Sequence, residues 1–157
     1  MKAPATFRKF SLAVLWHDAH HPGINMTKII IDACPCGAGM YVACCGPYHA
    51  GALPATAEEL MRSRYSAYAL GLMDYVYATW RHDTRPPLAE LQHDAAVKWL
   101  GLDIKHHALQ QECATVEFVA RTKLDGRAHR LHEVSRFVRE EGRWLYIDGS
   151  FPERVTT

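Results

Sequence analysis

The sequence predicts an α+β protein in which helices pack on one face of a curved antiparallel sheet, preceded by a small cysteine-rich element. Three observations predict this class. A helix start signal lies at Thr56, an alternation of apolar and polar residues begins at Trp99, and four of the five cysteines fall within positions 34–45. Helices followed by a run of strands are typical of α+β proteins.

Length and composition fit one domain with a small additional element. The chain has 157 residues, of which 48% are apolar and 22% charged, close to the average for soluble globular proteins. It carries 18 basic and 17 acidic residues, so general binding to nucleic acid or to a membrane surface is not expected. No run of about 20 apolar residues occurs, and a membrane span is therefore not expected.

The N-terminal residues 1–25 are interpreted as a disordered extension, or as part of an over-long gene whose natural start is Met26. Their apolar run 10–16 faintly resembles a signal peptide, but it meets His17-Asp18 where a cleavage site would need small residues. Clustered thiols indicate a metal site in a reducing compartment. A cytoplasmic location is therefore expected.

The elements follow in order along the chain. A short strand is expected over 26–32 and a linker over 49–54. Thr56 and Glu59 form a capping box that begins a helix, and Gly71 suits its C-terminal cap. We expect a second helix over 72–80 and a partly helical stretch over 88–99.

From Trp99 onward the period is two, as in strands. Leu100, Leu102 and Ile104 alternate with polar residues. Further strands are predicted over 115–122, 129–139 and 143–148, separated by the turn signals Asp125-Gly126 and Glu141-Gly142.

The cysteine segment has the composition of a metal site. Adjacent Cys44 and Cys45 cannot readily bridge each other, and an odd total fits a disulfide framework poorly. Four thiolates satisfy a tetrahedral Zn²⁺ ion at about 2.3 Å each, and the neighbouring glycines allow the tight turns required. We therefore predict one structural zinc ion, with these metal ligands: Cys34, Cys36, Cys44 and Cys45.

Other interpretations of the cysteines stay open. They could be four unligated thiols, or Cys36 and Cys44 could act in redox chemistry, although neither has the spacing of thioredoxin-like thiols. His49 is a substitute ligand candidate, and a linker histidine is the alternative.

Several motifs carry a family resemblance. The cysteine segment resembles the SEC-C element, which begins Cys-Pro-Cys-Gly and ends Cys-Cys-Gly. With the later motifs it is similar to the YchJ-type family of uncharacterised bacterial proteins over about residues 30–150. These motifs are Cys44-Cys45-Gly46-Pro47-Tyr48-His49, Leu60-Met61-Arg62-Ser63-Arg64-Tyr65-Ser66-Ala67-Tyr68, His132-Glu133-Val134-Ser135-Arg136-Phe137 and Trp144-Leu145-Tyr146-Ile147-Asp148-Gly149.

The resemblance implies a SEC-C element over 26–50 and a nuclear-transport-factor-2-like domain over 51–152, a cone of curved sheet and helices. It also makes a homodimer through the open sheet face an expectation. The seven residues between Cys36 and Cys44 are one fewer than in the usual SEC-C pattern, which would shift Cys44 and Cys45 relative to the metal.

A cone of this kind usually encloses an apolar cavity with a few polar groups. The alternation of side chains along a strand places Glu133 and Ser135 on one face. On the neighbouring last strand, Trp144, Tyr146 and Asp148 share a face. Helical residues 62–65 are available to meet them. The candidate pocket residues are Arg62, Arg64, Tyr65, Glu133, Ser135, Trp144, Tyr146 and Asp148.

Two functions follow from these residues. In an enzyme of isomerase or hydrolase type, of unknown substrate, Glu133 or Asp148 would be a general base in an apolar pocket. In a zinc-binding adaptor, Glu133 would instead form a buried ion pair with Arg64 or Arg62. The adaptor is preferred because no complete catalytic constellation is recognised. Its SEC-C element would contact a protein partner, and its cone would bind a partner or a small ligand.

Overall fold

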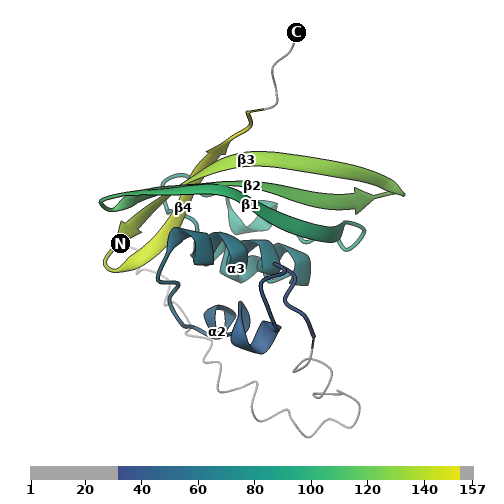
Figure 1. The fold of residues 1–157 in the computed structure, drawn as a ribbon, viewed down its shortest axis with the longest axis horizontal. Coiled ribbons are helices and arrows are strands. Elements are labelled where there is room, and N and C mark those ends of the chain that lie inside the picture. The colour runs from purple at the N-terminus through teal and green to yellow at the C-terminus, as the bar shows by residue number, and fades with distance from the viewer. Residues whose placement is uncertain (1–31, 153–157) are drawn as a thin grey trace, which may run out of the picture.

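The computed structural model describes residues 32–152 as a curved antiparallel sheet with helices against one face (Figure 1). The four strands are neighbours in chain order. Their bounds are Lys98–Gln110 for β1, Cys113–Leu124 for β2, Arg127–Glu140 for β3 and Arg143–Ser150 for β4. The predicted α+β class is confirmed. The strand expected before residue 32 and the extension over 1–25 lie outside the described residues.

Helix α3, Ala57–Leu70, has both predicted ends. The Glu59 backbone N–H donates to Thr56 Oγ1 at 3.1 Å, and the Thr56 N–H donates to Glu59 Oε2 at 3.3 Å. Gly71 has φ 75°, a left-handed conformation that glycine adopts without strain. The second predicted helix is α4, Met73–Ala78.

The stretch between α4 and β1 is mostly irregular, so the helical expectation over 88–99 is wrong beyond a short 3-10 helix η3, Leu88–Glu90. Trp99 belongs to β1, where its ring stacks on Tyr68 and meets the edge of Tyr65. This packing against α3 overrides the local preference of the segment.

The cysteine-rich segment contains a 3-10 helix η2, Tyr41–Ala43, and a short helix α2, Gly46–His49. It lies on the side of α3 away from the sheet (Figure 1). Three of its cysteines are buried in the same apolar core as Leu60, Phe118 and Phe137. The predicted linker therefore starts inside α2, and the segment packs as part of the core.

A β-bulge interrupts the pairing of β3 with β4. Arg136 pairs with Asp148 while Phe137 pairs with Tyr146, so Ile147 is the extra residue. An inserted residue reverses the alternation of side chains beyond it. Asp148 therefore lies on the outer face of the sheet and not beside Tyr146, and the predicted common face is wrong for this residue.

Among the described residues, no helix is both long enough and apolar enough to cross a membrane.

The capping box makes a first prediction. Thr56→Ala should lower the free energy of unfolding by about 1 kcal/mol, because the Glu59 N–H loses its acceptor. Thr56→Ser, which keeps the hydroxyl, should stay close to the parent protein in urea denaturation. Equal losses in the two variants would show that the side-chain cap contributes nothing.

Candidate functional site

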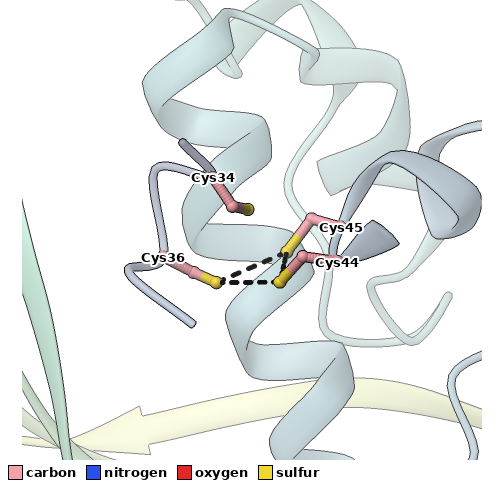
Figure 2. A group of neighbouring side chains, drawn as sticks. All are labelled: Cys34, Cys36, Cys44 and Cys45. Carbon is pink, nitrogen blue, oxygen red and sulfur yellow. Dashed lines mark hydrogen bonds between the residues drawn. The ribbon is translucent and has the colours of Figure 1, made fainter. Parts of the chain in front are cut away.

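The four predicted metal ligands converge from two segments of the cysteine-rich region (Figure 2). All four Sγ atoms lie within 4.8 Å of one another. The Sγ–Sγ distances are 3.4 Å for Cys36–Cys44, 3.7 Å for Cys36–Cys45 and 4.0 Å for Cys44–Cys45. A tetrahedron of sulfurs at about 2.3 Å from a zinc ion has edges of about 3.8 Å, so the cluster fits a metal ion. The shortened loop still brings Cys44 and Cys45 to Cys36.

The thiols influence one another strongly. The Cys45 thiol donates a hydrogen bond to Cys36, which lowers the pKa of Cys36 and raises that of Cys45. Burial, with the nearby Cys36, raises the pKa of Cys44. Neighbouring thiols therefore oppose each further negative charge in the cluster, and a bound cation would compensate that charge.

Helix α3 supports the cluster from the core side. Ser66 Oγ lies 3.4 Å from Cys34 Sγ and donates to Cys45 Sγ at 3.3 Å. Arg62 Nη1 donates to the Cys36 carbonyl oxygen at 3.4 Å. Sequence reasoning missed Ser66, although its position one helical turn after Arg62 and Ser63, on the polar side of α3, was the available signal.

His49 is not part of the cluster. Its Nε2–H donates to the Ser63 carbonyl at 2.8 Å, so its Nδ1 accepts from the Tyr41 hydroxyl, also at 2.8 Å. Burial lowers the pKa of His49, in keeping with a neutral ring. With both nitrogens engaged, His49 joins α2 to α3 and does not serve as a substitute ligand.

A second candidate site is a cavity of about 300 Å³ between α3 and the concave face of the sheet. Five of the eight candidate pocket residues line it: Arg64, Tyr65, Glu133, Ser135 and Tyr146. The remaining walls are largely aromatic and aliphatic, and comprise Met61, Tyr68, Trp80, Trp99, Phe118, Ala120 and Leu131.

Three candidate pocket residues lie elsewhere. Arg62 is on the opposite side of α3 from Arg64, where it pairs with Glu58 at 3.2 Å. Trp144 is buried near the start of α3, and its indole N–H donates to the Ala55 carbonyl at 3.1 Å. Asp148 forms a two-point ion pair with exposed Arg136 on the outer face, as the bulge in β4 requires.

Glu133 is held in the cavity by two hydroxyl groups. Its Oε1 accepts from Ser135 Oγ and from the Tyr146 hydroxyl, each at 2.9 Å. Burial, together with the charge of Glu133, raises the pKa of Tyr146, so this hydroxyl remains a donor.

Arg64 is held separately. Its Nη1 donates to the Val76 carbonyl and to Thr79 Oγ1, both at 2.8 Å. Its guanidinium lies 5.2 Å from the ring centre of Trp80 and 4.5 Å from that of Tyr146. The predicted ion pair of Glu133 with Arg64 or Arg62 is wrong, since no such pair occurs among the described residues.

Gly149 makes the position of Glu133 sterically feasible. A Cβ atom on Gly149 would lie 2.0 Å from Glu133 Oε1 and 2.5 Å from Cδ. The carboxylate therefore crosses the backbone of β4 at a position where no other residue fits without a shift.

Gly149→Ala should therefore lower the free energy of unfolding by about 1–3 kcal/mol, because the added methyl group overpacks the contact with Glu133. The double variant Gly149→Ala/Glu133→Ala should lose less than the sum of the two single variants, because truncation of Glu133 removes the clash. Urea denaturation of all three measures this coupling. Strictly additive losses would contradict the contact.

Comparisons with known proteins agree with this architecture. The family model for the YchJ middle NTF2-like domain matches residues 56–149. A UPF0225 protein of Ralstonia nicotianae is 60% identical over 129 residues, covering 74% of this chain and 90% of that protein. A UPF0225 protein of Chromobacterium violaceum is 56% identical over 123 residues, covering 74% and 91%.

Two solved structures of SEC-C motif containing proteins are similar. The one from Rhodopseudomonas palustris has a TM-score of 0.71 and 33% identity, covering 78% of this chain and all of that chain. The one from Psychrobacter arcticus has a TM-score of 0.68 and 31% identity, covering 82% and 88%. The chain therefore belongs to the YchJ-type family, with a SEC-C cysteine cluster and an NTF2-like domain.

Proposed function

We propose that the four clustered cysteines bind one structural Zn²⁺ ion, and that the protein is a zinc-stabilised adaptor that binds a protein partner through its SEC-C element. The observation that carries the metal site is the convergence of four thiols, three of them buried in the core. An all-sulfur set suits zinc. Because four thiolates complete a tetrahedron and leave no open position for substrate, the ion has a structural role.

The chemistry of the cavity supports binding in preference to catalysis. Its lining among the described residues includes no histidine, cysteine or lysine. Its one serine donates to Glu133. Glu133 lacks the arginine pair expected of an adaptor, but Glu133, Arg64 and Tyr146 do not form a recognised nucleophile–base constellation, so we favour binding over isomerase or hydrolase chemistry.

The SEC-C element presents apolar side chains to solvent. Met40 is 42% exposed and Val42 is 46% exposed, and both lie in the turn that joins the two cysteine pairs. Exposed apolar residues on an otherwise rigid element suit contact with another protein surface. Unoxidised thiols of this kind suit a reducing compartment, so we place the protein in the cytoplasm.

Metal analysis tests the first part. Protein purified under reducing conditions should carry one zinc ion per chain by native mass spectrometry. Cys45→Ser should lose the ion and melt at a lower temperature, because a structural metal supplies folding free energy.

Cys113→Ser is the matched control, since Cys113 is exposed on β2 outside the cluster. It should keep its zinc. A metal-free parent protein, or equal zinc in the parent and in Cys45→Ser, would refute the site.

A photo-crosslinking residue tests the partner surface. Placed at Val42 in living cells, it should give one discrete adduct that is absent with the same residue at exposed Gln111, in the β1–β2 turn. An adduct of twice the chain mass would identify a homodimer in place of a different partner. No adduct specific to position 42 would count against this surface.

A further inference from the structure

The cavity contains two charged groups that do not neutralise each other directly. Glu133 Oε1 has two hydroxyl donors, but Oε2 has no hydrogen-bond partner among the described residues. Arg64 Nη1 has two acceptors, whereas Nε and Nη2 have none within the same part of the chain. Arg64 is 3% exposed and Glu133 8% exposed. These open atoms of Glu133 and Arg64 are not among the fully buried polar atoms of the described residues, so they face the accessible space of the cavity, where a ligand or water can reach them.

Tyr146 fixes these two groups relative to each other. Its ring lies against the Arg64 guanidinium, and its hydroxyl donates to Glu133. Tyr146 is itself held through both of its backbone groups, since its N–H donates to Thr79 and its carbonyl accepts from Arg81. The cavity thus presents a rigid donor and a rigid acceptor side by side.

The Tyr65 side chain also lines the cavity. Its hydroxyl is fully buried, and burial raises the pKa of Tyr65 while the Gly101 backbone partly offsets that rise.

The walls and the volume restrict what could bind. Tyr68, Trp80 and Trp99 present flat apolar surfaces, which favour contact with a planar ring. The cavity volume of about 300 Å³ is the volume that about ten molecules occupy in liquid water. The site is therefore sized for one small ring with a short substituent.

Charge balance restricts the ligand further. Arg64 and Glu133 contribute one positive and one negative charge, so a ligand with its own net charge would bring an uncompensated charge into a buried site. We propose that the cavity binds a small, uncharged aromatic molecule with a carbonyl-type acceptor for Arg64 and an N–H or O–H donor for Glu133. An aromatic primary amide has this pattern.

This inference concerns a different site from the zinc ion, so either can fail without the other. The full chain, purified with its metal, is titrated with benzamide while the tryptophan indole N–H signals are followed by NMR. The signals of Trp80 and Trp99 should shift and saturate with a Kd on the order of 1 mM, typical of so small a molecule. Trp144, which does not line the cavity, is the internal control.

Matched probes define the ligand class. Benzoate adds a negative charge and benzylamine a positive one, so each should bind about tenfold more weakly than benzamide or worse. Toluene keeps the ring without polar groups and should also bind more weakly. Equal or tighter binding of benzoate or benzylamine would overturn the assignment to an uncharged ligand.

Variants test the residues. Glu133→Gln replaces the free acceptor atom with a donor and should weaken benzamide binding about tenfold. Glu117→Gln, the same change on the outer face, should leave it unaltered. Ala120→Leu should abolish binding by filling the cavity without altering either charge, which keeps the test valid if Glu133→Gln folds poorly. No saturable shift of Trp80 or Trp99, or full binding by a folded Glu133→Gln, would overturn the proposal.

Discussion

Helix α3 packs against the sheet with one face and against the cysteine cluster with the other, and both candidate sites depend on this double contact. Met61, Arg64, Tyr65 and Tyr68 follow the helical period along the cavity wall. Arg62 and Ser66 lie on the other side and bond to the cysteine loop. A metal ion on that side would therefore hold in place the helix that forms a wall of the cavity.

The buried charge of Arg64 shows how closely these contacts are linked. Burial lowers the pKa of Arg64, and the ion is accommodated by acceptors from α4 and by the rings of Trp80 and Tyr146. Trp80 reaches this position because its segment pairs with Tyr146 of β4. The charge is thus stabilised by dipoles and π faces, and the carboxylate of Glu133 remains available for other interactions.

Features of the chain that depend on neighbouring residues could be predicted from the sequence, whereas features that depend on distant contacts could not. The capping box at Thr56 and the turn at Asp125-Gly126 involve neighbouring residues, and both elements formed where expected. The segment over 91–97 was misjudged because its course is set by Trp99 packing on Tyr65 and Tyr68, a contact about thirty residues away in sequence. Arg62 was misplaced because two positions along a helix lie on nearly opposite sides.

The sequence by itself determined the family, the α+β class and the set of four cysteines, since each is written in residue types at short, regular spacing. Only the tertiary structure decided which polar side chains share the cavity. The bulge at Ile147 turned Asp148 outward, and Gly149 allowed Glu133 to cross β4 and meet Tyr146. Such choices depend on strand register and on steric contact between distant segments, which no local pattern encodes.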